Sequence, residues 1–345
     1  MKIFIDIGHP AHVHYFRNFI KLMEKKNYEF FISARDRNII QYLLNHYQIK
    51  FFNRGKGGRG IIGKIFYLFK GDYEVLKLAK LFQPDLFLSF GSMYAAQVSK
   101  ILNKPHIAFD DTDIAIFEHF LYVPFTDLII TPMNFLRNFG RKHIRFNGFM
   151  EMAYLHKKYF TEDKELKEKL SNQKYAVLRF SSWDANHDLL IKKTKKEEKI
   201  KLIELLKNEM DIIVVSENQS ENELSTLKIN YKPESFHTIL ANAFIYIGEN
   251  GTTATEAAIL GTPSVLISPL AKKVGNHLEL SNKYKLQYIY DNLNEAIYFI
   301  KKLIKNNELK YSHQLRSEQL FMDKIDVTEF MMNIVEEFIK TKFHN

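Results

Sequence analysis

The sequence predicts an α/β protein made of two doubly wound domains whose parallel sheets face each other across a cleft. Short apolar strands alternate with helices, which is typical of a parallel sheet covered on both faces. This alternation loosens from Phe146 to Asn172 and then resumes. The 345 residues also exceed one ordinary domain of about 150 residues. Ligands of such sheets bind outside the carboxyl ends of the strands, so the loops that follow the strands are the candidate sites.

The first half begins with a strand in KIFIDIG and a helix in VHYFRNFIKLMEKK, whose apolar residues recur at helical spacing. YEFFISARD predicts the next strand and NIIQYLLNHYQI the next helix. FFNRGKGGRGIIGK is a glycine-rich basic loop, followed by a helix in IFYLFKGDYEVLKLAKLF and a strand in PDLFLSF. GSMYAAQVSKILN then predicts a helix, and KPHIAFDDTD a strand with its loop.

The second half repeats this order. YAVLRFSSW predicts a strand, residues 193–209 a charged helix, DIIVVSE a strand and SFHTILANA a helix. FIYIG is the next strand and TTATEAAIL the next helix, which Gly261 and Pro263 end before the strand SVLIS. The polar run TEDKELKEKLSNQ predicts a solvated linker or surface helix. We therefore expect domains at residues 1–150 and 173–325, a linker at 151–172 and a closing helix at 326–345.

Composition narrows the function only broadly. The formal charge of +9 favours anionic partners such as nucleotides, phosphates or an acidic membrane surface. The absence of cysteine excludes disulfides, a thiolate nucleophile and cysteine-based metal sites. The apolar runs are shorter than the ~18 residues of a spanning helix, and Asp6 and His9 stand where a signal peptide would be apolar. We expect a cytoplasmic protein, and no nucleic-acid partner because no recognised motif or concentrated basic helix is present.

The turn in YIGENGTTATEAAIL carries the strongest signal. Gly248 and Gly251 permit backbone angles that a Cβ would obstruct, and Thr252 and Thr253 can cap the following helix. The N–H groups and dipole of such a helix terminus favour a phosphate. Glu256 falls about one turn into the helix, where a carboxylate can accept hydrogen bonds from a ribose diol. The alternative is a capped helix that binds no ligand.

Two further segments of the second half predict ligand contacts. RFSSWDANHD places Arg179, Ser181 and Ser182 in the first loop of this domain, where they could contact a diphosphate or sugar. A surface loop is the alternative. PESFHTIL places Phe236 and His237 where they could flank a nucleotide base, although Phe236 could equally be a core residue.

The first loop of the chain, GHPAHVHYF, carries His9, His12 and His14. A histidine can act as a general base or donate hydrogen bonds to a phosphate or sugar hydroxyl. Structural or surface histidines are the alternative. Since no carboxylate or further histidine lies at H-E-x-x-H-type spacing, we expect no metal site here.

Three acids and a small-residue turn follow later strands of the first half. Asp110, Asp111 and Asp113 in FDDTDIA could remove a hydroxyl proton, bind a metal or cap the next helix. Gly91 and Ser92 in FGSMYAA could contact an acceptor, and a plain turn is the alternative.

The basic loop NRGKGGRG offers Arg54, Lys56 and Arg59. It lacks the G-x-x-x-x-G-K-[ST] order of a Walker A loop. We interpret it as a mobile loop that reaches toward an anionic acceptor or lipid headgroup, with an ordinary surface loop as the alternative.

Three blocks, GHPAHVHYF, FGSMYAAQVSKILNKPHIAFDDTD and PESFHTILANAFIYIGENGTTATEAAILGTPSVLIS, together resemble the DUF354 family. That family is similar to GT-B glycosyltransferases of the MurG type and to hydrolysing UDP-GlcNAc 2-epimerases. The resemblance implies two Rossmann-like domains, a nucleotide-sugar donor held mainly by the second, an acceptor held by the first, and no metal requirement.

The resemblance also implies residue roles. Gly251, Thr252 and Thr253 match the diphosphate turn, and Glu256 matches the acid that binds the ribose hydroxyls. His12 matches the histidine of the first glycine-rich loop in MurG-like enzymes. Here that loop reads GHPAH and lacks two glycine pairs, so the resemblance does not imply a MurG-like lipid acceptor. NGTTATE matches the epimerase turn only in part.

The resulting hypothesis is a metal-independent glycosyltransferase that moves a sugar from a nucleotide-diphosphate donor, with UDP as the expected nucleotide, to a hydroxyl acceptor in cell-surface glycan biosynthesis. The general base is His12, Asp111 or Asp113. The expected donor-binding residues are Arg179, Ser181, Ser182, Phe236, His237, Asn250, Gly251, Thr252, Thr253 and Glu256, and the expected acceptor-side residues are His9, His14, Gly91 and Ser92. The expected partners are the donor and a glycan or lipid-linked acceptor, with peripheral contact at the inner face of the membrane as an option; no cofactor is expected. The alternatives are a hydrolysing nucleotide-sugar 2-epimerase and a non-catalytic nucleotide-sugar-binding protein.

Overall fold

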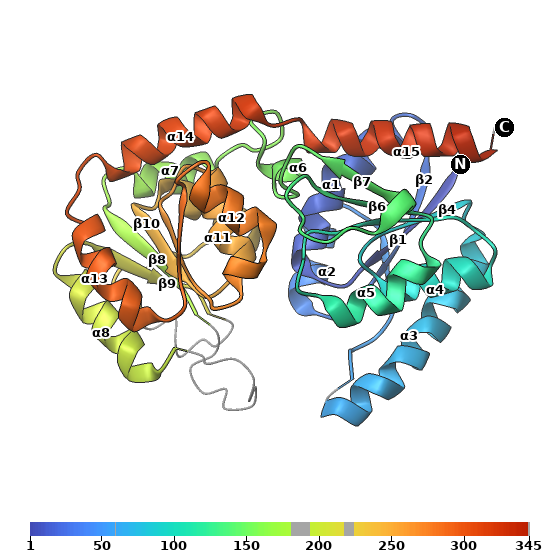
Figure 1. Cartoon of the computed structure of the whole chain (residues 1–345), viewed down its shortest axis with the longest axis horizontal. Coiled ribbons are helices and arrows are strands. Elements are labelled where there is room, and N and C mark those ends of the chain that lie inside the picture. Colours follow the sequence, from blue (N-terminus) through green and yellow to red (C-terminus); the bar gives the residue numbers. More distant parts are fainter. Residues whose placement is uncertain (59, 181–193, 217–223, 344–345) are drawn as a thin grey trace. The chain divides into compact units, whose positions relative to one another are not determined.

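The computed structural model describes residues 1–58, 60–180, 194–216 and 224–343 (Figure 1). The chain forms two compact units, one of Met1–Tyr159 with Ile325–Asn345 and one of Phe160–Lys324. Each unit contains one parallel sheet with helices on both faces. The predicted doubly wound α/β class is therefore confirmed for both units.

The sheet of unit 1 has the strand order β3-β2-β1-β4-β5-β6-β7, and its neighbouring strands pair in parallel. The order reverses between β1 and β4, which places the loops after these strands at the point where such sheets bind ligands. The strands are β1 Lys2–Ile7, β2 Glu29–Ala34, β3 Phe51–Asn53, β4 Leu86–Phe90, β5 His106–Phe109, β6 Leu128–Pro132 and β7 His143–Phe146.

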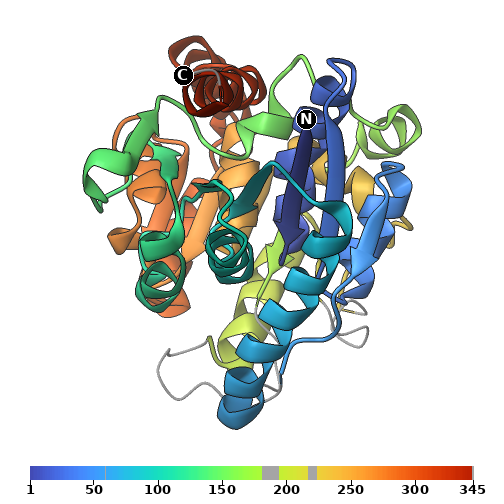
Figure 2. The ribbon, with the colours of Figure 1, turned by 90° about the vertical axis from the view of Figure 1, so that its right-hand side faces the viewer.

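Helices cover both faces of this sheet, and α3 is the long light-blue helix in the foreground of Figure 2. On one face Phe4, Phe31 and Phe87 of adjacent strands pack together under Val75 of α3 and Val98 of α4. The other face carries α1, from which aromatic rings reach β5 and β2. The helices are α1 Pro10–Glu24, α2 Asn38–His46, α3 Gly60–Phe82, α4 Met93–Ile101, α5 Ile116–Tyr122, α6 Met152–Leu155 and α15 Val327–Phe343, with 3-10 turns η1 Val123–Phe125 and η2 Gly140–Lys142.

The C-terminal helix α15 packs on unit 1. The Ile325 N–H donates a hydrogen bond of 3.1 Å to the Asn147 carbonyl oxygen, and Thr328 Oγ1 donates one of 2.8 Å to the Ala153 carbonyl oxygen. α15 also contacts α1 and α6. The end of the chain therefore completes the fold of the unit that its beginning forms.

The sheet of unit 2 has the order β12-β11-β10-β8-β9, again parallel throughout. Its strands are β8 Tyr175–Arg179, β9 Asp211–Val214, β10 Ile245–Gly248, β11 Ser264–Ile267 and β12 Gln287–Tyr290. Its helices are α7 Lys164–Leu170, α8 Lys196–Lys207, α10 Phe236–Asn242, α11 Gly251–Ile259, α12 Gly275–Asn282, α13 Leu293–Leu303 and α14 Leu309–Asp323, with 3-10 turns η3 Pro233–Ser235 and η4 Ala271–Lys273.

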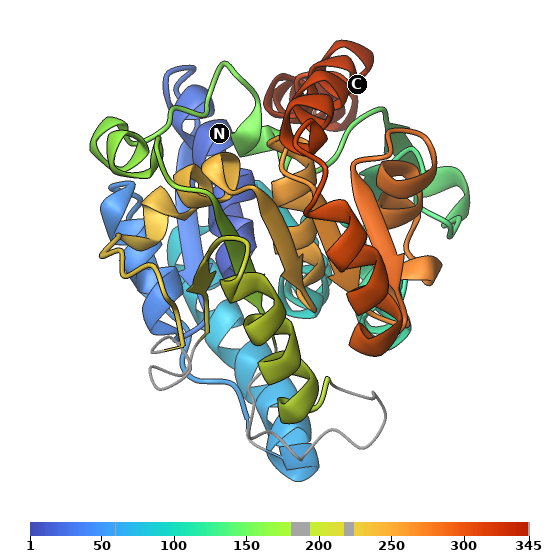
Figure 3. The same cartoon turned by 90° about the vertical axis from the view of Figure 1, so that its left-hand side faces the viewer.

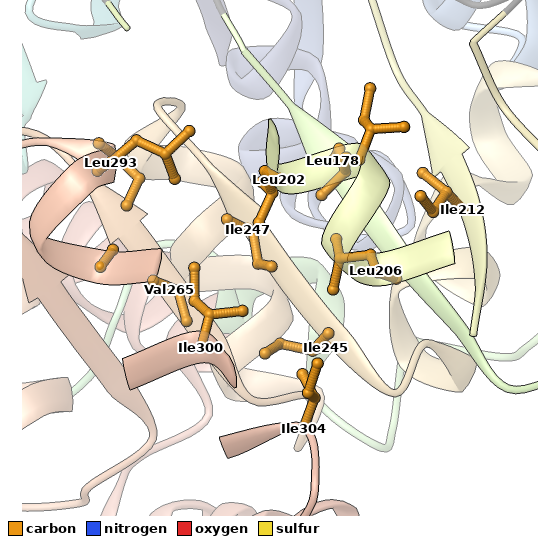
Figure 4. Close-up of a cluster of buried hydrophobic side chains, with 14 of the residues drawn as sticks. Leu178, Leu202, Leu206, Ile212, Ile245, Ile247, Val265, Leu293, Ile300 and Ile304 are labelled. Atoms are coloured by element: carbon orange, nitrogen blue, oxygen red, sulfur yellow. The ribbon is translucent and has the colours of Figure 1, made fainter. Parts of the chain in front are cut away.

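One face of this sheet packs against α8 and α13, and α8 is the olive helix in the foreground of Figure 3. Leu202 and Leu206 of α8 and Ile300 of α13 surround Ile247 and Val265 of the central strands (Figure 4). The opposite face packs against α7, α10 and α11. The central strands β8, β10 and β11 read as continuous apolar runs because both of their faces are buried.

Most predicted elements are present, and a few segments differ from the prediction or decide between its alternatives. α3 begins at Gly60, inside the segment expected to be a glycine-rich loop. The polar run near residues 161–173 contains the surface helix α7, which buries Leu166 and Leu170. Strands β6 and β7 lie before the loosening at Phe146 and were not among the predicted strands.

Candidate functional site

The turn between β10 and α11 is held by its own side chains and by strand β8. Asn250 caps α11, because its Oδ1 accepts a hydrogen bond of 2.9 Å from the Thr253 N–H. Gly248 lies so close to β8 that a Cβ there would be 2.2 Å from the Arg179 carbonyl oxygen. The predicted capped turn is present, but Asn250 supplies the cap that we expected from Thr252 or Thr253.

Arg179 reaches this turn from the end of β8. Its Nη1 donates a hydrogen bond of 2.7 Å to Thr253 Oγ1, and its guanidinium carbon lies 5.9 Å from the centre of the Phe236 ring. The structure thus brings together three of the expected donor-binding residues from β8, α10 and α11. A cation beside a helix N-terminus adds to the attraction of that terminus for an anion.

His237 and Glu256 form a buried pair behind the turn. Their side chains meet at 2.9 Å between Nε2 and Oε1, with only 4% and 6% of the two residues exposed. Phe160 and Phe236 place their rings 6.4 and 6.2 Å from the imidazole. The sequence marked both members of the pair as candidates but gave no sign that they contact each other.

His277, at the start of α12, is a neighbour of the turn that was not among the predicted site residues. A Cβ at Gly251 would lie 2.9 Å from His277 Nε2, so the imidazole lies directly beside the first residue of α11. Burial lowers the pKa of His277 to about 4, so the ring is neutral at physiological pH. The signal was available, because α12 follows the strand next to β10 and the carboxyl ends of parallel strands meet at one edge.

The remaining residues of this region are Glu249 and two of the expected donor-binding serines. Glu249, to which we assigned no role, accepts a hydrogen bond of 2.9 Å from the Thr194 N–H through Oε1. Ser181 and Ser182 lie outside the described residues.

Unit 1 contains a cavity of about 760 Å³ at the carboxyl ends of β1, β4 and β5. Four expected acceptor-side or catalytic residues line it, namely His9, His12, Gly91 and Ser92. His14 does not line the cavity. Its side chain is buried on the other face of α1, where its ring centre lies 5.1 Å from that of Tyr154. Three of the four residues expected on the acceptor side therefore share one cavity.

The base of this cavity is a charged cluster around Asp6, whose role the sequence did not reveal. Asp6 is 1% exposed and accepts hydrogen bonds of 2.6 Å from Ser33 Oγ, 2.7 Å from Arg54 Nε and 2.6 Å from Ser92 Oγ. The interpretation of Arg54 as a cation on a mobile loop is wrong, because Arg54 is 3% exposed. The buried Asp6 carboxylate holds it there, since an unpaired buried charge of either sign would be costly.

His12 lies in the cavity as a neutral hydrogen-bond donor. Burial, together with the charges of His9 and Arg54, holds the pKa of His12 well below its usual range. The Gly8 N–H donates a hydrogen bond of 3.4 Å to His12 Nδ1, which leaves the proton of the neutral ring on Nε2. The Phe90 ring lies 4.9 Å away and limits the movement of the imidazole.

The three acids after β5 have different surroundings. Asp110 accepts hydrogen bonds from the Thr112 N–H at 2.8 Å, from the Tyr122 hydroxyl at 2.5 Å and from His119 Nε2 at 2.9 Å. Asp113 is buried and accepts a hydrogen bond of 2.6 Å from the Leu136 N–H. Both carboxylates therefore hold the loop in place.

Asp111 differs from its two neighbours. Burial, and next the charge of Asp110, raises the pKa of Asp111 to about 7. Its partners are the hydroxyls of Thr112, at 3.1 Å, and Tyr15. Asp110 and Thr112 line the cavity, whereas Asp111 and Asp113 are not part of its lining. A pKa of about 7 suits Asp111 to exchange a proton near neutral pH.

The described part of the chain contains neither a membrane-spanning helix nor a cluster of metal ligands. Within residues 1–58, 60–180, 194–216 and 224–343, no helix combines the length and apolar character needed to cross a bilayer. In the same ranges, no three histidine, cysteine, aspartate or glutamate side chains gather as metal ligands would.

Solved structures with the same architecture define the fold class. The S. aureus MnaA–UDP co-structure has a TM-score of 0.74 at 13% identity, covering 98% of this chain and 97% of that one. UDP-GlcNAc 2-epimerase from Neisseria meningitidis, bound to UDP-GlcNAc, has a TM-score of 0.68 at 14% identity over 99% and 100% of the two chains. Acinetobacter baumannii MurG has a TM-score of 0.63 at 12% identity over 97% and 99%. The protein has the GT-B fold that glycosyltransferases and these epimerases share.

The family is shown by the sequence itself. A family model described as "Protein of unknown function (DUF354)" matches residues 1–340, so the chain belongs to the DUF354 family, as the resemblance predicted. "Uncharacterized protein MJ0665" of Methanocaldococcus jannaschii is 28% identical over 289 residues, covering 78% of this chain and 82% of that protein.

Proposed function

We propose that the protein transfers a sugar from a nucleotide-diphosphate donor to a hydroxyl acceptor. The observation that carries the proposal is the β10–α11 turn of unit 2, where Arg179 lies beside the N-terminus of α11 and a buried carboxylate follows one turn later. A helix N-terminus with a neighbouring guanidinium suits a diphosphate, and a carboxylate suits the ribose hydroxyls. The MnaA structure of the same fold contains UDP, which supports UDP as the nucleotide.

In this proposal the donor side stabilises the leaving group. The N–H groups of Gly251 and Thr252 and the Arg179 guanidinium face the diphosphate, where negative charge develops as the glycosidic bond breaks. Glu256, oriented by its hydrogen bond with His237, binds the ribose, and Phe236 flanks the base.

The acceptor side supplies proton transfer. We assign Asp111, whose chain neighbours Asp110 and Thr112 line the cavity, as the group that accepts the hydroxyl proton. A pKa of about 7 lets Asp111 exist as a carboxylate and take up a proton at neutral pH. His12 orients the acceptor oxygen through its Nε2–H, and it would need the other tautomer to act as a base itself. Asp113 positions the loop rather than reacting, because its Oδ1 is already bonded to the Leu136 N–H.

We also propose a cellular process, a compartment and an acceptor class for the reaction. Cell-surface glycan biosynthesis in the cytoplasm, with a glycan or lipid-linked acceptor, is consistent with the basic charge of +9. Phe117 and Phe120 of α5, 64% and 71% exposed, are side chains that a lipid-linked acceptor or the inner membrane face could contact.

Nucleotide binding tests the donor site first. We expect UDP to raise the melting temperature of the full chain more than UMP or uridine, since a ligand that binds only the folded state stabilises it. Glu256→Gln keeps the hydrogen bond with His237 but removes the charge, and should weaken UDP affinity about tenfold. Glu249→Gln, in the same turn, is the matched control. Equal UDP affinity in the Glu256 variant and the unmodified protein would remove the ribose assignment.

A second candidate function is hydrolytic 2-epimerisation of a nucleotide sugar. It is favoured by the unit 1 cavity, which is large enough for a sugar and whose lining includes Asp110 and Thr112, the two chain neighbours of Asp111. In this reaction a proton is moved on the nucleotide sugar itself. Incubation with UDP-sugars and no acceptor separates the two functions. Stoichiometric formation of UDP and free epimerised sugar would establish the epimerase and overturn the transferase.

A further inference from the structure

Arg54 lines the unit 1 cavity, and its Nη2 group carries two N–H donors. Its Nε donates to Asp6 and its Nη1 donates at 2.8 Å to the Tyr67 hydroxyl, while its guanidinium lies 4.6 Å from the centre of the Tyr94 ring. These contacts fix the plane of the guanidinium. Its Nη2 lies beside Gly8, another cavity residue, and donates to no side chain or carbonyl of the described residues.

A second arginine lines the same cavity. The Arg35 guanidinium lies against Gly57, where a Cβ would come within 2.2 Å of its Nη2. Gly57 therefore makes room for this side chain, since any larger residue there would displace it. Arg35 and Arg54 follow β2 and β3, whose carboxyl ends lie at the same edge of the sheet.

The two buried acids of the cavity lining already accept hydrogen bonds from the protein, whereas Arg54 Nη2 donates to no group of the described residues. Asp6 accepts three hydrogen bonds and Asp110 accepts three, all from protein groups. The third acid of the lining, Glu118, is exposed to solvent. The groups of the lining that can donate to a ligand include the two guanidinium groups and the Nε2–H of His12. All of them donate hydrogen bonds, and the arginines add positive charge.

We propose that this cavity binds an anionic oxygen group, a carboxylate or a phosphate, carried by the acceptor. Arg54 Nη2 and Arg35 hold the two oxygens, and the apolar rings of Phe90 and Tyr94 cover the rest of the acceptor. Naming the ligand as the acceptor rests on the proposed function, in which the nucleotide diphosphate is bound by α11 of unit 2. The presence of an anion-binding cavity in unit 1 does not depend on it.

Calorimetry with the full chain tests this proposal. Glucuronate and inorganic phosphate are titrated at constant ionic strength in the presence of saturating UDP, with glucose as the neutral comparison. We expect one of the two anions to bind and glucose not to bind, and the anion that binds identifies the chemical group. Arg35→Gln should weaken the binding about tenfold or more, while Arg141→Gln, an equal charge change at an exposed position outside the cavity, should leave it unchanged.

A double variant tests Arg54 without leaving a buried charge unpaired. Asp6→Asn with Arg54→Gln removes both charges together, so the unit can fold, which circular dichroism checks. This variant should lose anion binding. If neither anion binds, or if the anion binds equally well to the Arg35 and Asp6/Arg54 variants, the proposal is overturned even when UDP binding persists. If UDP fails to bind while an arginine-dependent anion still binds, the proposed function falls and the anion site remains.

Discussion

The buried Asp6–Arg54 pair gives the sharpest test of how unit 1 is held together. We consider the variant Arg54→Met, which keeps most of the side-chain volume but removes the charge. Asp6 would keep the hydroxyls of Ser33 and Ser92 as hydrogen-bond donors. Its carboxylate, which is 1% exposed, would lose the positive charge that pairs with it. Removing one partner of a buried ion pair costs about 3–5 kcal/mol, and the two remaining donors place our expectation near the lower limit, at about 3 kcal/mol.

A second substitution shows whether this cost comes from the unpaired carboxylate. Asp6→Asn in the Arg54→Met background removes the buried charge, while the amide oxygen can still accept from Ser33 or Ser92. We expect the double variant to recover about 2 kcal/mol relative to Arg54→Met alone, because residues in direct contact do not contribute additively.

Hydrogen exchange of the β1 and β4 amides is the suitable assay. Because the chain has two units, a single free energy of unfolding is not well defined, whereas these amides report on unit 1 alone. A loss of about 3 kcal/mol corresponds to exchange faster by about 100-fold. Lys26→Met is the control, since the Lys26–Glu336 bridge is partly exposed and contributes about 1 kcal/mol at most. If the exchange rates of these amides rose by less than about fivefold in the Arg54 variant, the argument that this pair stabilises unit 1 would be refuted.

Two further predictions concern other buried groups. Burial, and next the charge of Asp6, raises the pKa of Asp72 from 3.8 to about 7, so its protonation favours folding fully below about pH 4 and this contribution is lost as the pH rises to about 7. The free energy of unfolding of Asp72→Asn should therefore equal that of the unmodified protein at pH 4. At pH 8 the variant should be more stable by about 1–2 kcal/mol, after allowance for solvent screening. Glu74→Gln on the same helix is the control, and an equal gain in stability at both pH values would contradict the assignment. Gly248→Ala should destabilise unit 2 by about 2–3 kcal/mol, because its Cβ would lie 2.2 Å from a backbone oxygen of β8. Faster exchange of the β10 amides would show this, whereas Gly8→Ala, whose nearest neighbour would be at 3.7 Å, should have little effect in unit 1.

Local patterns in the sequence were sufficient for much of the fold. Helix α8 and strand β10 lie where periodicity and apolar runs placed them. The turn before α11 was recognisable because glycine, a capping side chain and helical periodicity all lie within a few residues. Such features depend on backbone angles and on neighbours up to four positions away, so they can be read from the sequence directly.

The short elements were not recognisable in the same way. Strand β3 has only three residues and lies inside a segment that reads as a basic loop. Strand β7 is four residues long and mixes charged and apolar side chains in HIRF. These strands exist because a neighbouring strand offers hydrogen-bonding groups, and that neighbour is distant in the sequence.

The chemistry of the site was decided mainly by tertiary structure. The sequence by itself marked His12, Asp111 and Glu256 as candidates, because it shows which polar residues follow the strands. It could not show that Arg54 would be buried against Asp6, 48 residues away, or that His237 would meet Glu256. Whether a charge is buried, paired or available to a ligand depends on which distant side chains surround it, and only the packed sheets and helices determine those neighbours.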